Sequence, residues 1–422
     1  MPASLLKAPL SKGPRNLHLS QSPQTSGHRL QTLNWGLGLD LPNLNPLQGF
    51  NFVTPVILSL VLEGLMTFNS SAQLAPLLAK EVVQPNPVTF VYTLQPGIRF
   101  QDGSLLRAAD VVYALSQNMD SNLASQYSTF FSNIRTIKAT KRDEVTITIE
   151  APDATFKYTM AQAGAYVMPA RYLQDAGSQI GSPSYPPMGT GPYFVAAYTP
   201  GGSVELRRNR YYWGPPVEIE DISIRIIPND AERLLALKSG AIDGTFDLPY
   251  QDSAVWESMT TGGTFGTAAA FMTFNVTHRP WNGIHVRRPI AYSTNRKTLV
   301  RSFLHSAGAI APTFIPPPFW PAVGAPQSEM HAFYRSLPQY EYGWEGRREE
   351  VGLSSAPKAR AETVYVPSGR PRMVELGLTL VRAVKPLGID IHLSEIPSEK
   401  WNESVHPWAG NYFLSSGLPG TR

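Results

Sequence analysis

The fold is decided by the stretch Tyr92–Thr93–Leu94–Gln95–Pro96–Gly97–Ile98–Arg99–Phe100–Gln101–Asp102–Gly103. Residues 88–94 are rich in β-branched and aromatic side chains and predict a strand. Pro96–Gly97 ends this strand, and the tight turn Asp102–Gly103 predicts a hairpin-like return. A helix is expected next over residues 108–119. It carries Asp110 in its first turn, where the helix dipole favours a negative charge.

The rest of the chain alternates predicted strands with predicted helices. An apolar segment of helix length covers residues 53–66, and the proline-rich residues 311–357 predict a loop that crosses the surface. Residues 222–246 predict a strand–helix–strand unit, which is the mark of an α/β domain. The expected strands cover residues 30–35, 145–149, 203–206, 222–226, 242–246 and 389–393, and the later helices cover residues 230–238 and 373–385.

The composition indicates a long globular chain without cysteine chemistry. Its 422 residues are 42% hydrophobic and 16% charged, which suits two or three packed domains. Because cysteine is absent, disulfides, thiolate zinc sites, cysteine nucleophiles and lipid-modified cysteine anchors are excluded. The 33 glycines and 38 prolines favour turns and extended segments over a helical bundle.

The net charge of +4 arises at the beginning of the chain. Residues 1–39 contain four basic residues and no acidic one, while the charges of the remaining chain balance. We interpret residues 1–29 as a solvated, flexible leader and expect no nucleic-acid partner. The four basic residues are Lys7, Lys12, Arg15 and Arg29.

The apolar runs are too short to cross a membrane. The longest, residues 52–66, is interrupted by Pro55 and Glu63, so we expect a soluble protein. The beginning of the chain shows no apolar stretch typical of a secretory signal.

No motif for catalysis, nucleotide binding or metal binding survives inspection. The glycine clusters at residues 36–41 and 189–194 lack the third glycine and the Lys–Ser/Thr of phosphate-binding loops. The eight histidines lack metalloprotease spacing, and the chain contains no Gly-x-Ser-x-Gly. Glu349 and Glu350 lie in an arginine-rich stretch typical of a solvated charge cluster. We therefore predict no catalytic residue, no cofactor and no metal.

Tryptophan is the one residue type that suggests a ligand cleft. Several of the eight tryptophans lie in loop-like sequence, where aromatic rings hold extended ligands between lobes. Packing in the core is the alternative for most of them. The tryptophans in such surroundings are Trp35, Trp213, Trp281, Trp320, Trp344, Trp401 and Trp408.

Taken together, these segments resemble the solute-binding proteins of ABC importers, family 5, the oligopeptide/dipeptide/nickel-binding type. The stretch 92–103, continued by residues 108–113, is similar to the family's Gly-x-x-Phe-x-Asp-Gly turn and Ala-x-Asp-Val helix start. Two differences are Pro289, where the family has alanine, and Asn295, where it has aspartate. Further similar segments follow in the family's order at residues 74–79, 189–193, 208–213, 234–243, 274–275, 286–288 and 295–296.

The resemblance implies a fold and a domain plan. The fold is α/β and periplasmic-binding-protein-like, with two lobes that close around a hinge. Residues 30–49 and 187–270 would form the first lobe, residues 50–186 a small domain packed on it, and residues 271–422 the second lobe.

The resemblance also implies ligand-binding residues. Phe246 and Asp247 follow the Ile–Asp strand, and Arg370 or Arg372 lies near the start of the last helix. An alternative is that Asp247 caps a turn and the arginines are solvated. The complete predicted set is Phe246, Asp247, Asn275, Arg370, Arg372 and Trp35.

The end of the chain differs from the family pattern. Family members continue past a Gly-Trp-x-x-Asp segment, whereas this chain passes through residues 411–418 without it and stops at Arg422. We expect an incomplete second lobe, as in a fragment, a frameshifted copy or a variant with altered closure.

Three functions follow from the sequence. The first is an extracytoplasmic, monomeric solute-binding protein that is not an enzyme, captures a peptide-like solute and delivers it to ABC permease subunits. Within it, a nickel chelate or an oligosaccharide is the alternative solute. The second is a sensor or interaction module with the same fold, and the third is a hydrolase with a noncontiguous site.

Overall fold

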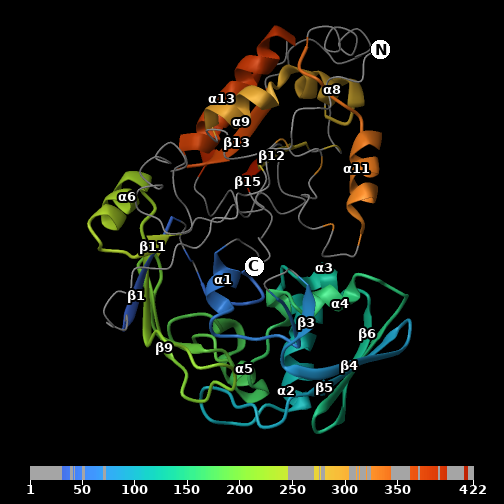
Figure 1. The fold of residues 1–422 in the computed structure, drawn as a ribbon, viewed down its shortest axis with the longest axis vertical. Coiled ribbons are helices and arrows are strands. Elements are labelled where there is room, and N and C mark those ends of the chain that lie inside the picture. The colour runs from blue at the N-terminus through green and yellow to red at the C-terminus, as the bar shows by residue number, and fades with distance from the viewer. Residues whose placement is uncertain are drawn as a thin grey trace.

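The fold is seen in a computed structural model (Figure 1). The structure describes residues 31–38, 41, 43–49, 53–69, 73–245, 270–274, 276, 281–303, 310, 313, 320, 325–343, 362–368, 371–387, 390–396 and 413–416. Within these ranges, helices and strands alternate in the mixed α/β manner that the sequence predicts.

A five-stranded sheet of mixed direction has the order β11-β1-β10-β9-β8. Strand β1 (Thr32–Leu37) lies between β10 (Asp221–Ile226) and β11 (Gly244–Thr245) and runs parallel to both. Strands β9 (Ser203–Arg208) and β8 (Tyr193–Thr199) continue the sheet in antiparallel pairs. The strands expected near residues 30–35, 203–206 and 222–226 are thereby confirmed.

Helix α6 (Asp230–Lys238) connects β10 to β11 and passes over β1. It begins at Asn229, whose side chain accepts hydrogen bonds from the backbone N–H groups of Ala231 (2.9 Å) and Glu232 (3.1 Å). Such N-caps satisfy donors that the first helical turn leaves unpaired. The helix is followed by Gly240 at φ +73°, a conformation that favours glycine. The predicted strand–helix–strand unit is thus confirmed.

A second, antiparallel sheet has the order β4-β5-β7-β6. Its strands are β4 (Ala79–Asn86), β5 (Thr89–Leu94), β7 (Glu144–Ile149) and β6 (Ile134–Lys141). Every second side chain of β5 and β7 is buried, which is the pattern of a sheet with one covered face. Helix α2 (Ala108–Ser116) packs on β6 and β7.

Asp102 and Asp110 explain why the stretch at residues 92–103 and the helix after it fold as predicted. Asp102 accepts a hydrogen bond from the N–H of Ser104 (2.8 Å) in a turn that holds Gly103 at φ +89°. Asp110 accepts from the N–H of Arg107 (2.9 Å) and so caps α2. Its other oxygen accepts from the N–H of Ala170 (2.9 Å), at the start of α5 (Ala170–Ala176). One carboxylate therefore fixes the beginnings of two helices.

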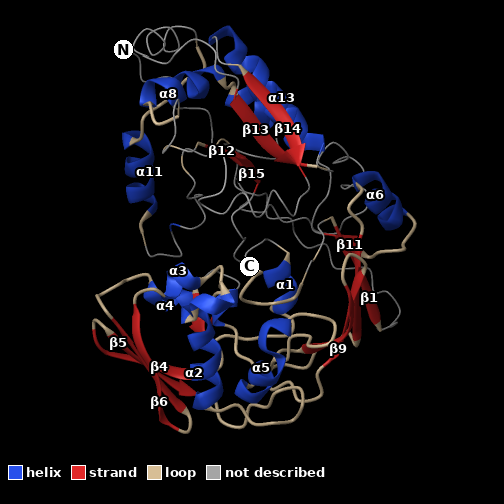
Figure 2. Ribbon diagram, turned by 180° about the vertical axis from the view of Figure 1, so that it is seen from behind, coloured by secondary structure: helices blue, strands red, loops and turns tan. Residues whose placement is uncertain are grey.

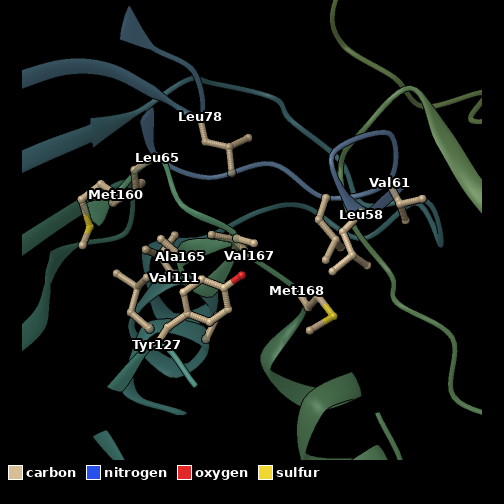
Figure 3. Close-up of a cluster of buried hydrophobic side chains, with 14 of the residues drawn as sticks. Leu58, Val61, Leu65, Leu78, Val111, Tyr127, Met160, Ala165, Val167 and Met168 are labelled. Carbon is tan, nitrogen blue, oxygen red and sulfur yellow. The ribbon is translucent and has the colours of Figure 1, made fainter. Parts of the chain in front are cut away.

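One hydrophobic cluster joins the first two sheets. It extends from Leu37 to Ile224 and includes side chains of both sheets and of α1 (Thr54–Leu58). Figure 3 shows how the loop after α1, the segment before α5 and helix α2 bring their apolar side chains together. The labelled members are Leu58, Val61, Leu65, Leu78, Val111, Tyr127, Met160, Ala165, Val167 and Met168.

A separate cluster lies in the last part of the chain. It contains Trp281 and side chains of α8 (Ile284–Ser293), β13 (Glu362–Pro367) and α13 (Pro371–Val384). These elements accompany a sheet of order β12-β15-β13-β14, where β13 and β14 (Ile391–Ile396) are parallel. The helix and strand expected after residue 373 are confirmed. Strands β12 and β15 are Ala270–Thr273 and Phe413–Ser416.

The helix expected over residues 53–66 is wrong in its extent. Only Thr54–Leu58 is helical, because the carbonyl oxygens that follow accept hydrogen bonds from other segments of the chain. The oxygens of Leu60 and Val61 accept from the N–H groups of Tyr193 (2.9 Å) and Gly191 (3.0 Å). The apolar residues 53–66 are therefore apolar because they are buried, not because they form one helix. The following strand is β2 (Met66–Phe68), which pairs with β3 (Leu74–Pro76).

The loop expected over residues 311–357 is also wrong in part. Helix α11 (Gln327–Ser336) lies inside it, between Pro326 at its N-cap and Pro338 shortly after its end. Proline is compatible with both positions, so a proline-rich composition hides a proline-free helix. The remaining described helices are α3 (Ser128–Phe131), α4 (Phe156–Thr159) and α9 (Arg296–Phe303), and none in the described part of the chain could span a bilayer.

The substitution Asp110→Ala tests the double role of this carboxylate. It leaves the N–H groups of Arg107 and Ala170 without their acceptor, so we expect a loss of about 1–3 kcal/mol in the free energy of unfolding. The measurement is denaturant unfolding followed by circular dichroism. Asp175→Ala on α5 is the control, because its exposed carboxylate only faces Arg171 at 3.9 Å. Equal stability of the two variants would contradict this role.

Candidate functional site

The carboxyl ends of β1, β10 and β11 form one edge of the first sheet. These parallel strands end at Leu37, Ile226 and Thr245. In open α/β sheets, ligands bind at the carboxyl ends of parallel strands. In both ribbon views, α6 and β11 lie at the end of this sheet toward the sheet of β12–β15 and α13 (Figures 1 and 2). We take this edge as the candidate site.

Arg233 of α6 is buried at this edge, with 2% of its surface exposed. Its guanidinium donates to the carbonyl oxygen of Ile227 (2.7 Å) and pairs with Asp230 (2.5 Å). A Cβ on Gly38 would lie 2.8 Å from the Nη1 atom of Arg233, so a larger residue there would require the buried guanidinium to shift. Sequence reasoning missed Arg233, because a single arginine on a helix gives no signal of burial.

Trp35 is a sheet residue and not a loop residue. It lies on β1, and its ring covers Gly244 of β11, where a Cβ would lie 2.3 Å from the ring. The neighbouring Asn34 donates its backbone N–H to the carboxylate of Asp243 (2.7 Å). The expectation of a loop tryptophan is therefore wrong, and the packing alternative describes its ring. Its contact with a ligand remains a prediction.

The other predicted ligand residues lie at or beyond the limits of what the structure describes. Phe246 and Asp247 follow Thr245, the last residue of β11, and lie outside the described residues together with Asn275 and Arg370. Arg372 lies in the first turn of α13, which follows β13. In chain order, Phe246 and Asp247 follow β11 of the first sheet. Trp35 lies on β1 of that sheet, and Arg372 lies in the helix that follows β13.

In the sheet of order β12-β15-β13-β14, the register separates the start of α13 from the end of β12. Thr273 pairs with Phe413, and Phe413 pairs with Tyr365, so β12 ends level with the middle of β13. Ala270, where β12 begins, pairs with Ser416 further along β15. Because β13 and β15 are parallel, the beginning of β12 is the end that lies toward the start of α13. The chain thus enters this sheet on the side of Arg372.

The residues beside Asn275 belong to packing. The ring of Phe274 lies 5.1 Å from the ring of Trp281, which is fully buried. Arg287 of α8 donates a hydrogen bond to the carbonyl oxygen of Trp281. This predicted tryptophan is therefore a core anchor.

The two differences from the family pattern are accommodated locally. Pro289 is buried inside α8. Asn295 accepts a hydrogen bond from the backbone N–H of Thr298 (3.0 Å), so its side chain caps α9 without the charge of an aspartate. Arg296 donates to the carbonyl oxygen of Tyr340 (3.1 Å), and burial lowers its pKa.

A buried carboxylate, Glu63, was not predicted as a functional residue. Only 5% of its surface is exposed, and its Oε2 accepts from Thr190 Oγ1 (2.7 Å) and from Trp213 Nε1 (2.8 Å). Burial raises the pKa of Glu63, while the two hydrogen bonds oppose this rise. The only signal in the sequence is an acid within the apolar run of residues 52–66.

The role of Glu63 is structural: it connects segments that are distant in the sequence. Thr190 belongs to the turn at residues 189–193 and Trp213 to the segment 208–213, so the carboxylate ties these two motifs to the loop after α1. Gln101 donates its backbone N–H to the carbonyl oxygen of Gly189 (3.0 Å). This hydrogen bond attaches the stretch at residues 92–103 to the same junction. The second glycine cluster bends at residues 190–192, and the strand predicted to follow it is β8. Among the described residues, acidic and histidine side chains form no group able to hold a metal ion.

The family of the chain follows from comparison with known proteins. The model of bacterial extracellular solute-binding proteins, family 5 Middle, matches residues 73–420. The chain therefore belongs to family 5 of the bacterial extracellular solute-binding proteins, as its motifs predict.

The curated relatives are distant and longer. The glutathione-binding protein GsiB of Escherichia coli O157:H7 is 25% identical over 287 residues, which cover 67% of this chain and 55% of that protein. The chain thus spans about half the length of the curated relatives it matches.

Solved structures confirm the fold class. The oligopeptide-binding protein AppA from Bacillus subtilis, solved with a nonapeptide, has a TM-score of 0.81 at 15% identity, covering 93% of this chain and 81% of AppA. The ABC transporter-associated periplasmic binding protein DppA from Helicobacter pylori, solved with the peptide STSA, has a TM-score of 0.79 at 18% identity, covering 92% and 78%. The fold is the predicted α/β, periplasmic-binding-protein-like fold with two lobes.

The substitution Glu63→Gln tests the electrostatics of the junction. A raised pKa in the folded state means that the ionised carboxylate costs stability, and that this cost disappears as the pH falls through the folded pKa toward the ordinary value of 4.5. We therefore expect the unfolding free energy of the wild type, relative to the variant, to increase between pH 8 and pH 4.5.

The measurement is urea unfolding across this pH range, followed by the fluorescence of the tryptophans. The control is Glu81→Gln, on the exposed strand β4. A wild type that loses stability relative to Glu63→Gln on acidification would refute the assignment.

Proposed function

We propose that the chain is the solute-binding component of an ABC importer. It captures a peptide-like solute between two lobes and delivers it to permease subunits in the membrane, outside the cytoplasm and as a monomer. It makes and breaks no covalent bond. Membership of family 5 supports this proposal, and so does the likeness to folds that close around ligands.

One observation carries the proposal. The carboxyl ends of the parallel strands β1, β10 and β11 meet at the edge where the chain leaves the first sheet. After residues 246–269 the chain enters the sheet of β12, β15, β13 and β14 at Ala270, on the side where α13 begins. A guest held between these edges contacts both lobes, so its binding energy favours the closed arrangement.

The chemistry of the predicted residues matches a peptide-like solute. We assign Asp247 to the ammonium group of the solute and Arg372 to its carboxylate. Arg372 lies in the first turn of α13, where the helix dipole also favours an anion. Phe246 and Trp35 would provide apolar contact, and Arg370 a second cation.

Asn275 stays a proposed contact, and in chain order it follows the end of β12 rather than its beginning. The neighbouring Thr273 lies level with Tyr365 in the register of the sheet, away from the start of α13. The adjacent Phe274 packs on Trp281.

We also propose the domain plan that the family resemblance implies. Residues 30–49 and 187–270 form the first lobe, residues 50–186 the small domain and residues 271–422 the second lobe. Two separate apolar clusters support a division near residue 271. The first cluster spans the first lobe and the small domain, which suits a small domain packed on that lobe.

A panel of solutes tests the proposed function. Reduced glutathione, tetra-alanine, the nickel–histidine complex and maltotriose are added to the full chain, and binding is measured by titration calorimetry. We expect heat and a raised melting temperature with a peptide. If only the nickel complex or the oligosaccharide binds, the proposed peptide-like solute is wrong and the bound compound gives the class of solute. Turnover of a peptide or ester would contradict a purely binding role.

Two substitutions test the proposed contacts. Asp247→Asn and Arg372→Ala each remove one charge-assisted hydrogen bond, so we expect peptide affinity to fall about ten-fold or more. Asp175→Asn on α5 and Arg335→Ala on α11 are the matched controls, because both side chains are exposed outside the proposed site. Unchanged affinity in Asp247→Asn and Arg372→Ala would refute the assignment of the contacts while leaving solute binding standing.

A further inference from the structure

A cavity of about 160 Å³ lies between the loop at residues 45–48 and the small-domain segments α2 and α5. None of its lining residues belongs to the carboxyl edge of the first sheet. It is lined by Asn45, Pro46, Leu47, Gln48, Ala114, Gln117, Asn122, Leu123, Ala124, Gly164, Tyr166, Met168, Leu173, Gly177, Ser178 and Ile180.

The lining is uncharged and divided into an apolar floor and a polar rim. Buried Met168, Leu173 and Ile180 belong to the floor, while Gln48 and Asn122 are exposed at the rim. Side-chain amides carry both donors and acceptors. Nδ2 of Asn122 already donates one hydrogen bond to Asp120 (2.9 Å), which leaves its second N–H and its oxygen for a guest. With no acidic or basic side chain in the lining, the cavity offers no counter-charge to an ion. It suits an uncharged molecule with an apolar body.

Hydrogen bonds between distant segments hold the walls in place. The N–H of Leu44 donates to the carbonyl oxygen of Gly181 (3.0 Å), and the N–H of Gln126 donates to that of Leu47 (2.9 Å). Asn118, in the 3-10 helix Gln117–Met119 that follows α2, donates its side-chain amide to the carbonyl oxygen of Gly164 (2.6 Å). The cavity is therefore built before any guest enters, which lowers the entropic cost of binding.

Ala124 shapes one wall of the cavity. It lies at φ +46° and is the one non-glycine residue with a positive φ in the described part of the chain. In this conformation it ends the short 3-10 helix Ser121–Leu123 and turns the chain toward Gln126.

We propose that this cavity is a second binding site, for a small neutral molecule of the phenol or short-chain alcohol type. A cavity of about 150 Å³ accommodates benzene, which sets the guest at roughly six to eight non-hydrogen atoms. The apolar body rests on the floor, and one hydroxyl group bonds to the amides of the rim. This site is distinct from the edge proposed for the peptide-like solute and does not depend on that function.

Phenol is the probe, and benzoate is its charged counterpart of similar shape. Thermal unfolding of the full chain is measured with each, together with saturation-transfer NMR of the probe. We expect phenol at about ten times its dissociation constant to raise the melting temperature by about 2 °C, and benzoate to have no effect. No saturation transfer from the wild type to phenol, or equal binding of benzoate, would overturn the proposal.

Leu123→Trp fills the cavity from its partly exposed wall, and Leu235→Trp on α6 is the matched control, at a residue that is 67% exposed. We expect the first variant to lose the phenol effect and the second to retain it. Circular dichroism checks that each is folded. If Leu123→Trp does not fold, Ala114→Leu fills the floor instead. Retention of phenol binding by the folded cavity variant would show that the guest binds elsewhere.

Discussion

The pairing of β1 between β10 and β11 is the constraint on which the rest of the structure depends. It places residues 32–37 between two strands that come much later in the chain, and its parallel direction gives the three strands a common carboxyl edge. The bond between Asn34 and Asp243 and the buried Arg233 complete this edge. If β1 were absent, β10 and β11 would have no shared neighbour, and the edge would lose its order.

Local patterns were enough to predict most of the elements. The strands at residues 88–94 and 145–149, the helix at residues 230–238 and the turn at Asp102–Gly103 follow from short-range signals, and each is found as expected. Errors arose where distant contacts decide the outcome. Residues 59–65 are apolar enough to suggest a buried helix. The carbonyl oxygens of Leu60 and Val61, however, accept hydrogen bonds from the N–H groups of Tyr193 and Gly191.

The candidate site was less predictable than the fold. Chain order placed Phe246 and Asp247 after a strand, and the structure shows that this strand is parallel to β1 and ends at the common edge. The packing of Trp35 on Gly244 depends on the pairing of two strands that sequence alone does not join. Glu63 and the neutral cavity arise from segments that meet only in the folded chain, so no spacing in the sequence reveals them.

The absence of cysteine allows the central claim, closure of two lobes on a guest, to be measured directly. Lys238→Cys on α6 and Arg382→Cys on α13 introduce two exposed labelling positions, one on each proposed lobe. The distance between two spin labels at these positions is measured by pulsed electron paramagnetic resonance, without and with a saturating peptide. We predict a shorter and narrower distance distribution in the presence of the peptide. An unchanged distribution with the peptide demonstrably bound would contradict the account.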